Sequence, residues 1–256
     1  NRTTLIVVPI IASLGITIPK TSSRAITSPA GTADTMEVFT NVNLSLSQMQ
    51  KVVEKENGCI AWGNAIKLSP ADDIIIRVER ALDIDSENQM IASILSKKIA
   101  AGSTHCVIDI PYGKTAKVRS IDAAHKLAEK LQHVATFIGL QVRTIISDGS
   151  QPVGYGIGPS LEARDVLSVL RNELSASGDL RTRALKIATE IIKMVHNLDD
   201  HEAFLLAEQQ ITNGRALNTF LRICESQGGF AEPRYGLYSK TIEAMSSGVI
   251  SEIDNR

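Results

Sequence analysis

The sequence has few of the features that mark membrane proteins or nucleic-acid-binding proteins. Aromatic residues make up 4% of its 256 residues, and 27 Lys and Arg residues nearly balance 28 Asp and Glu residues, so that the net charge is −1 with no basic block. The positive patch and the stacking rings of a nucleic-acid binder are therefore missing. The longest apolar run, Leu5 to Ala12, is interrupted by Pro9 and is far below the roughly 18 residues that a transmembrane helix needs.

The chain also lacks paired cysteines and clustered metal ligands. Cys59, Cys106 and Cys224 are widely spaced with no Cys-x-x-Cys pair, and the five histidines are scattered. The cysteines indicate reduced, buried thiols in a cytoplasmic protein, and we expect neither a metal nor a cofactor. With 43% hydrophobic residues, the sequence predicts a globular protein that acts on a small polar molecule, not on nucleic acid or a membrane.

One stretch, residues 22–37, gathers small hydroxyl residues, a glycine and an arginine between two regular elements. Residues 16–19 predict a short strand, and residues 33–39 predict a helix with Thr32 as its N-cap. A helix start offers unpaired N–H groups and the positive end of the dipole, and hydroxyl groups add donors without bulk. This combination suits an oxyanion such as phosphate, although a polar connecting loop with an ordinary threonine cap would show the same residues.

Two runs within this stretch are distinctive: Ser22-Ser23-Arg24-Ala25-Ile26 and Gly31-Thr32-Ala33-Asp34-Thr35-Met36-Glu37. Together they resemble the signature of the thymidine phosphorylase and pyrimidine-nucleoside phosphorylase family. The run from Lys20 to Ser28 is most similar to the archaeal-type branch, which includes AMP phosphorylases and proteins named thymidine phosphorylases. The likeness continues to Ser251-Glu252-Ile253-Asp254 and covers essentially the whole chain. It implies inorganic phosphate as a co-substrate, and a phosphate or nucleotide site made of Thr4, Ser22, Ser23, Arg24, Ala25, Ile26, Thr27, Ser28 and Thr32.

A second group of candidates lies between residues 80 and 117. Ser93 and Lys97 are four residues apart, so they share one face of the helix predicted over residues 86–100. The resemblance implies that Arg80, Ser93 and Lys97 bind the base, that Asp85 donates a proton, and that Lys117 contacts the nucleotide. From the residues alone, Arg80 and Lys97 equally indicate a solvated helix face. Asp85 equally indicates an acidic residue favoured by a helix start, and Lys117 a surface loop.

Elsewhere, hydrophobic spacing predicts alternating strands and helices. Residues 3–14 predict a helix, which Pro9 would kink or whose start it would move towards the middle. Ser45 and Gln48 form a capping box at the start of the helix predicted over residues 46–56. Pro159 stands where a dinucleotide fingerprint needs its last glycine, so we expect no dinucleotide site in residues 154–159. The remaining predictions are strands over 59–62, 105–110 and 142–146, helices over 46–56, 121–138, 161–174, 181–198, 202–211 and 216–226, and mixed turn and strand character over 233–253.

This alternation predicts an α/β protein with a mixed, largely parallel sheet flanked by helices. By the resemblance, residues 1–70 and 101–256 would form the α/β domain, and residues 71–100 would be a helical segment belonging to a separate helical lobe. The chain begins at Asn1 without an initiator methionine, so we expect the family's upstream phosphate loop and N-terminal helical lobe to be absent. In full-length form we expect a homo-oligomer whose cleft closes on the substrate.

The implied reaction is phosphorolysis of thymidine to thymine and 2-deoxyribose 1-phosphate. Residues 28–32 lack the histidine that bacterial pyrimidine phosphorylases carry before the conserved aspartate, which leaves open phosphorolysis of AMP or another nucleoside 5′-monophosphate to ribose 1,5-bisphosphate. Phosphoribosyl transfer to an aromatic amine, as in the related anthranilate enzymes, is another alternative. A fourth is a non-catalytic binding or scaffold fragment.

Overall fold

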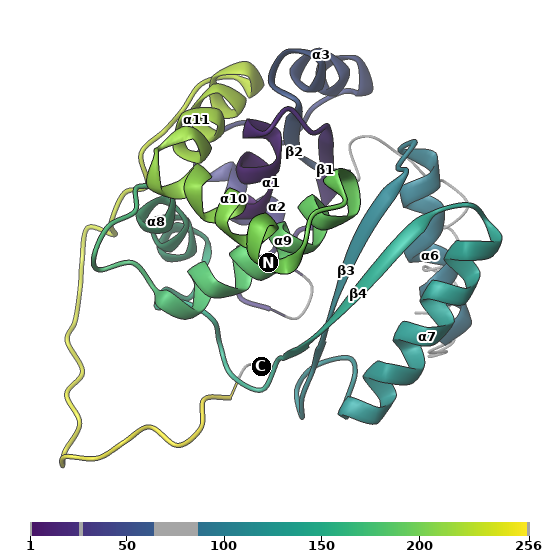
Figure 1. The fold of residues 1–256 in the computed structure, drawn as a ribbon. Helices are drawn as coiled ribbons and strands as arrows, with labels where there is room; N and C mark the ends of the chain where they lie inside the picture. The colour runs from purple at the N-terminus through teal and green to yellow at the C-terminus, as the bar shows by residue number, and fades with distance from the viewer. Residues whose placement is uncertain (1, 26–27, 64–86, 255–256) are drawn as a thin grey trace.

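The computed structural model of the chain describes residues 2–25, 28–63 and 87–254, in which strands and helices alternate (Figure 1). In chain order the elements are α1 (Thr4–Ser13), β1 (Ile18–Ser22), α2 (Thr32–Glu37), α3 (Leu46–Glu56), β2 (Gly58–Trp62), α6 (Glu87–Ala100), β3 (His105–Tyr112), α7 (Ile121–Phe137), β4 (Gln141–Asp148), α8 (Pro159–Leu170), α9 (Gly178–His196), α10 (Asp200–Thr212) and α11 (Arg215–Gln227).

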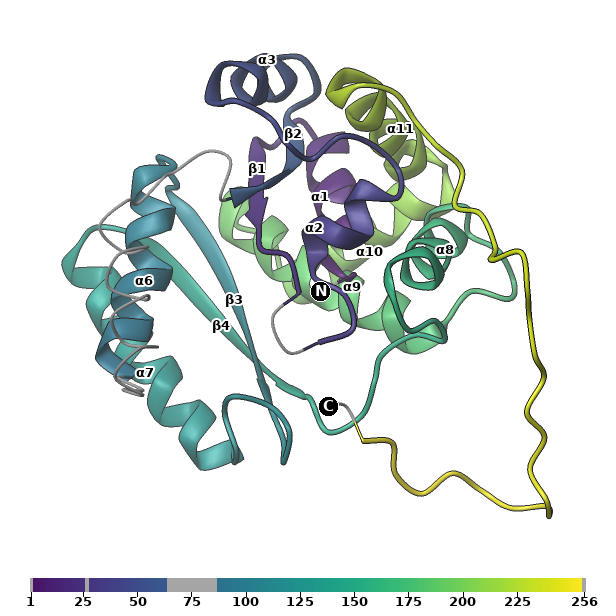
Figure 2. The same cartoon turned by 180° about the vertical axis from the view of Figure 1, so that it is seen from behind.

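The strands form two parallel pairs. β1 pairs with β2, with Ser22 opposite Trp62, and β3 pairs with β4, with Tyr112 opposite Asp148. Figures 1 and 2 show β1 beside β3, and the loops that follow β1, β3 and β4 at the same end of the molecule. The fold is therefore a mixed α/β arrangement of parallel strands flanked by helices, which confirms the predicted class.

Helix α1 is the centre of the larger core. Every side chain from Leu5 to Ala12 is buried, and the helix packs against β1, β2, α2, α8, α9, α10 and α11. Of the two effects expected of Pro9, a kink or a shifted helix start, the shifted start does not occur, because α1 begins at Thr4 and runs through the proline. A proline inside a helix costs about 3 kcal/mol, and burial of large apolar side chains, at about 1.5–3 kcal/mol each, outweighs it.

A second apolar cluster holds β3, β4, α6 and α7 together. Ile91 and Leu95 of α6 pack with Leu127 and Leu131 of α7 and with Ile110 of β3. Helix α9 packs on the other side of β3 (Figure 1). The pair β3–β4 is thus covered by helices on both faces, as expected for parallel strands. The division between an α/β domain and a helical lobe at residues 71–100 stays a prediction.

Gln227, at the end of α11, binds both main-chain groups of Ile60 in β2. The Ile60 N–H donates to Gln227 Oε1 at 2.9 Å, and Gln227 Nε2 donates to the carbonyl oxygens of Ile60 at 3.0 Å and Asn41 at 2.9 Å. Gln227 is only 3% exposed. A residue 167 positions away in the sequence therefore fixes β2, and through it β1.

We expect Gln227→Leu to lower the free energy of unfolding by about 3 kcal/mol. The substitution leaves one buried N–H and two buried carbonyl groups without their Gln227 partner, and each unsatisfied group costs about 1–3 kcal/mol. Urea unfolding of the chain measures this change. Gln209→Leu is the control, since Gln209 is exposed on α10 and its replacement should change stability by less than about 0.5 kcal/mol. Equal stabilities of the two variants would contradict the prediction.

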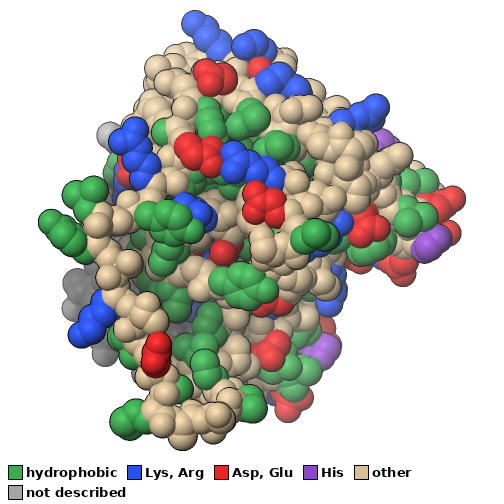
Figure 3. All heavy atoms as spheres, turned by 90° about the vertical axis from the view of Figure 1, so that its left-hand side faces the viewer, with side chains coloured by type: hydrophobic (Ala, Val, Ile, Leu, Met, Phe, Trp, Pro, Cys, Tyr) green, Lys and Arg blue, Asp and Glu red, His purple; other side chains and the backbone are tan. Residues whose placement is uncertain are grey.

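The segment from residue 231 to residue 254 contains no helix or strand, so the strand character predicted for residues 233–253 was wrong. The N–H groups at its two ends are bonded to loops: that of Ala231 donates to the carbonyl oxygen of Phe39, and that of Ile253 donates to the Gln151 side chain. Figure 3 shows hydrophobic side chains on the face that this segment crosses. Its large exposed hydrophobic residues are Tyr235, Leu237, Tyr238, Ile242, Met245, Val249, Ile250 and Ile253.

Candidate active site

The stretch singled out in the sequence connects the end of β1 to the start of α2. Ser22 is the last residue of β1 and is buried, so the strand extends three residues further than the sequence predicted. Thr32 is also buried, as the first residue of α2. Ser23 and Ala25 are exposed between them. The two buried hydroxyl residues thus flank a loop at the carboxyl end of parallel strands, where open α/β sheets bind their ligands.

The N-cap of α2 is Gly31, which corrects the assignment of Thr32 to that position. The Gly31 N–H donates to Asp34 Oδ2 at 2.9 Å, and the Ala33 N–H donates to the carbonyl oxygen of Ser23 at 3.2 Å. Two of the amide groups that the sequence offered to an oxyanion are therefore bonded within the loop itself. The start of α2 therefore offers fewer amide donors to an anion than the sequence indicated.

Arg24 is held by three side chains of the site. Its guanidinium donates to both carboxylate oxygens of Glu37, at 2.6 and 2.8 Å, and to Asp34 Oδ1 at 3.0 Å. It also lies over the Trp62 ring, with Cζ 4.9 Å from the ring centroid. A bidentate, stacked arginine is strongly fixed in orientation. Arg24 therefore ties the loop to α2 and β2, and its predicted contact with phosphate stays a prediction.

The two carboxylates that hold Arg24 stay ionised. The Arg24 hydrogen bonds lower the pKa of Glu37 below its usual range. Burial raises the pKa of Asp34, but the N–H donors of Gly31 and Ala25 and the Arg24 guanidinium outweigh burial and lower it overall. Protonating either carboxylate requires acid well below neutral pH, so the Arg24 cluster is intact under physiological conditions.

Thr4 is the first residue of α1 and is partly buried. The start of this helix is fixed by Arg2, which donates to Asp165 at 2.6 Å and lies 3.4 Å from Glu162. Asp165 also accepts two main-chain N–H groups from the loop before α8, each at 2.8 Å. In this loop Gly154 adopts φ +89°, and a Cβ there would lie 2.7 Å from Arg2 Nη1. The buried ion pair thus positions Thr4.

Ser93 and Lys97 lie together on α6, as their spacing predicted. Lys97 Nζ donates to Ser93 Oγ at 3.4 Å, and both side chains are partly buried. Ile91 and Leu95 bury other positions of the helix in the second cluster. The polar pair is therefore held by a packed helix and not by a free one.

Lys117 lies exposed in the loop between β3 and α7. This loop and the loop after β4 are joined, because the Gly149 N–H donates to the carbonyl oxygen of Tyr112 at 2.8 Å. The end of the described chain also reaches them, with Glu252 3.8 Å from Lys114.

The remaining predicted site residues lie elsewhere. Ser28 is partly buried, and its hydroxyl donates to the carbonyl oxygen of Ala30 at 2.9 Å. Four others lie outside the described residues: Ile26, Thr27, Arg80 and Asp85.

The sequence interpretation assigned no role to Lys20, although the matched run begins there. Lys20 Nζ donates to Ser22 Oγ at 3.0 Å. Burial and then the neighbouring charge of Lys98 lower the pKa of Lys20 to about 7. A lysine inside a strand, two residues from a candidate hydroxyl, was the signal that could have identified it.

The prediction that all three cysteines are buried holds only in part. Cys59 and Cys224 are buried, whereas Cys106 is partly buried. Burial raises the pKa of the Cys59 thiol to about 11 and also raises that of Cys224. Thiols held in the neutral form are poor nucleophiles. The described residues hold no group of three or more side chains arranged to bind a metal, and none of their helices is long and apolar enough to cross a membrane.

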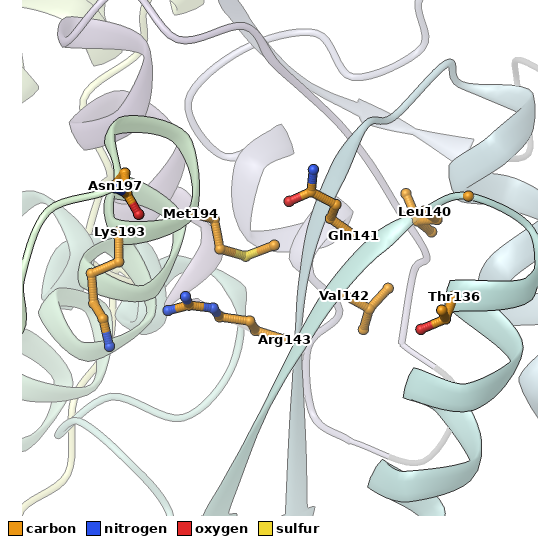
Figure 4. Close-up of a pocket in the computed structure, with 9 residues that line it drawn as sticks. Thr136, Leu140, Gln141, Val142, Arg143, Lys193, Met194 and Asn197 are labelled. Atoms are coloured by element: carbon orange, nitrogen blue, oxygen red, sulfur yellow. The ribbon is translucent and has the colours of Figure 1, made fainter.

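A cavity of about 480 Å³ lies away from these residues (Figure 4). It is lined by the end of α7, the start of β4 and the end of α9, including Gln141, Arg143 and Lys193. Arg143 and Lys193 both pair with Glu190, at 3.1 and 2.9 Å. None of the predicted site residues lines this cavity, and it lies at the opposite end of β4 from the loop after Asp148.

Comparison with known proteins gives three results. The glycosyl transferase family, a/b domain, matches residues 2–217. The "Putative thymidine phosphorylase" of Hahella chejuensis is 54% identical over 256 residues, covering 100% of this chain and 51% of that protein, and "Putative thymidine phosphorylase 1" of Acidovorax sp. is 56% identical, with coverages of 100% and 50%. The chain thus spans about half the length of the curated relatives it matches.

The fold is similar to that of anthranilate phosphoribosyltransferases. The enzyme from Thermus thermophilus superposes with a TM-score of 0.68 at 16% sequence identity, covering 88% of this chain and 73% of that one. The Saccharomyces cerevisiae enzyme gives a TM-score of 0.54 at 15% identity, with coverages of 88% and 68%. At this level of identity the likeness is one of fold.

Proposed function

Since the chain belongs to the glycosyl transferase family, a/b domain, we propose that it forms the phosphate-binding part of a nucleoside phosphorylase acting on thymidine. The observation that carries this proposal is the placement of the buried hydroxyl residues Ser22 and Thr32 at the end of a parallel strand and the start of α2, with Arg24 between them tied to Asp34 and Glu37. The names of the relatives from Hahella chejuensis and Acidovorax sp. support thymidine as the substrate.

In the proposed reaction an oxygen of inorganic phosphate attacks C1′ of the sugar. The bond from C1′ to the base breaks, and its electron pair leaves with the base. Ser22 and Thr32 would hold the phosphate through hydroxyl groups that the fold has already oriented, which is the most effective form of electrostatic stabilisation. Thr4 and the exposed Ser23 would add donors from neighbouring elements.

The departing base gains negative charge and takes up a proton. Ser93 and Lys97, bonded to each other on α6, would bind the base together with Arg80, and Lys97 would offset its charge. Asp85 would donate the proton, for which its carboxyl group must remain protonated until the base departs. Asp85→Asn in the full-length protein should abolish most turnover, and unchanged turnover would remove Asp85 from the mechanism.

A nucleoside 5′-monophosphate such as AMP is the second candidate substrate. Residues 28–30 are Ser-Pro-Ala, without the histidine of bacterial pyrimidine phosphorylases. Ser23, Ala25 and Lys117 are exposed, so they are accessible to a second phosphate group on the sugar. These features are the support for a nucleotide as the second candidate.

The test is phosphate-dependent release of base by the full-length protein, with thymidine, uridine, AMP and CMP offered separately. We expect release of thymine only when phosphate is present. Release from the monophosphates alone would replace thymidine by the second candidate. No release from any of the four would contradict the proposal and favour a non-catalytic binding domain.

A further inference from the structure

Lys20 places an ammonium group against the hydroxyl loop. Its Nζ donates to Ser22 Oγ at 3.0 Å and also to the carbonyl oxygen of Thr21. Lys20 and Ser22 are two residues apart on β1, so they lie on the same face of the strand. An ammonium group has three N–H donors, which leaves one for a ligand, and Ser22, which accepts from Lys20, keeps its own O–H to donate. Both donors therefore meet at the carboxyl end of β1.

Among the residues that the structure describes, no carboxylate balances the charge of Lys20. The titratable groups that face it are Lys98 from α6, Cys106 from β3 and Cys59 from β2, and none of the described carboxylates contributes. Helix α1, which packs on β1, carries no titratable side chain. The charged residues of α3, which also packs on β1, are Lys51, Glu54, Lys55 and Glu56, and Glu56 is bonded to Arg222.

A partly buried cation that no described carboxylate faces is held less favourably than a paired one, and the nearby Lys98 makes this more so. An oxyanion beside Ser22 would relieve both effects. We propose that Lys20 is an oxyanion-binding residue of this site, holding one phosphate oxygen jointly with the Ser22 hydroxyl. This inference rests on the proposed function, since it adds a residue to the same phosphate site.

Protonation of Lys20 then controls anion binding. Burial and Lys98 lower its pKa to about 7, so the free protein carries the ammonium form below this pH and loses it above. A bound anion stabilises the ammonium form and raises the pKa. Affinity for the anion is therefore highest below about pH 7 and falls as pH rises, by up to about tenfold per pH unit once Lys20 is largely deprotonated in the free protein.

Sulfate is the probe for this test, because its charge does not change between about pH 5.5 and about pH 9, whereas that of phosphate does. Isothermal titration calorimetry of the full-length protein should give a sulfate affinity that falls above about pH 7. Lys20→Met should weaken binding about tenfold or more at low pH and remove the fall. Lys20→Arg should bind at low pH and show no fall near neutral pH, since arginine stays charged.

Lys98→Met is the matched control, because it removes the neighbouring charge but leaves the Lys20–Ser22 bond. It should shift the fall in affinity to higher pH, an effect that a purely structural role for Lys20 would not produce. Wild-type affinity and an unchanged pH profile in Lys20→Met would overturn the inference. If base is released but Lys20→Met binds sulfate normally, the inference fails and the proposed function stands. If sulfate binding depends on Lys20 but none of the four substrates is cleaved, the proposed function fails and the anion site stands.

Discussion

Arg24→Ala is expected to lower kcat/KM about a hundredfold in the full-length protein. The guanidinium joins the loop to Glu37, Asp34 and Trp62, and its loss frees the main chain directly after Ser22 and Ser23. Displacing substrate-positioning groups by about 1 Å can cost about a hundredfold in rate. Steady-state kinetics with phosphate as the varied substrate measures the loss, and Arg24→Lys should not restore activity, because lysine cannot form the bidentate contact.

A double-mutant cycle separates this positioning role from direct phosphate binding. If Arg24 acts through Glu37, then Glu37→Ala alone should lose nearly as much activity, and the double variant should be little worse than either single variant. If Arg24 binds phosphate directly, Glu37→Ala would keep the KM for phosphate while Arg24→Ala raises it. Arg171→Ala is the control, since Arg171 forms a similar bidentate pair with Glu232 on the surface, at 2.9 Å for both contacts, and its loss should leave activity unchanged.

Gly31→Ala is expected to reduce kcat/KM by more than a hundredfold and to lower stability by about 1–3 kcal/mol. A Cβ at this position would lie 2.5 Å from the carbonyl carbon of Arg24, 2.6 Å from the Ala25 nitrogen and 2.6 Å from the Ser23 carbonyl oxygen. All three atoms belong to the main chain, so the loop itself must move away from α2. With φ at −89°, Gly31 has a backbone conformation open to any residue, and the effect is therefore steric alone.

Gly178→Ala provides the comparison for Gly31→Ala. Gly178 is the first residue of α9, and a Cβ there meets no heavy atom within 4 Å. Because alanine favours a helix over glycine, this variant should keep full activity and gain up to about 1 kcal/mol of stability. Kinetics and urea unfolding of both variants decide the matter, and normal activity in Gly31→Ala would show that the close approach of the loop to α2 is unimportant.

The sequence was most informative where a local pattern determines the structure. The 3-and-4 spacing that includes Ala124, Leu131 and Ala135 predicted α7, and these three residues are buried in it. The capping box of Ser45 and Gln48 predicted the start of α3, where both hydrogen bonds are present. Nearby residues suffice for such features, because a helix face and a helix cap involve side chains three or four positions apart.

Features that depend on distant partners could not be predicted in this way. Helix α1 tolerates Pro9 because seven other elements bury it, and β2 is completed by Gln227 from α11. At the site, the spacing of Ser93 and Lys97 correctly predicted a shared face. The stacking of Arg24 on Trp62 was not predictable, since it depends on the approach of Trp62 from a different strand.

The most direct test of the account is a ³¹P NMR measurement on the full-length protein with thymidine and inorganic phosphate. If the loop of residues 22–32 holds a phosphate that attacks C1′, the inorganic phosphate signal should decrease as a sugar 1-phosphate signal of equal intensity appears, and Gly31→Ala should abolish both changes. Base released without consumption of phosphate would indicate hydrolysis and would contradict the account, as would equal turnover by Gly31→Ala and the unaltered protein.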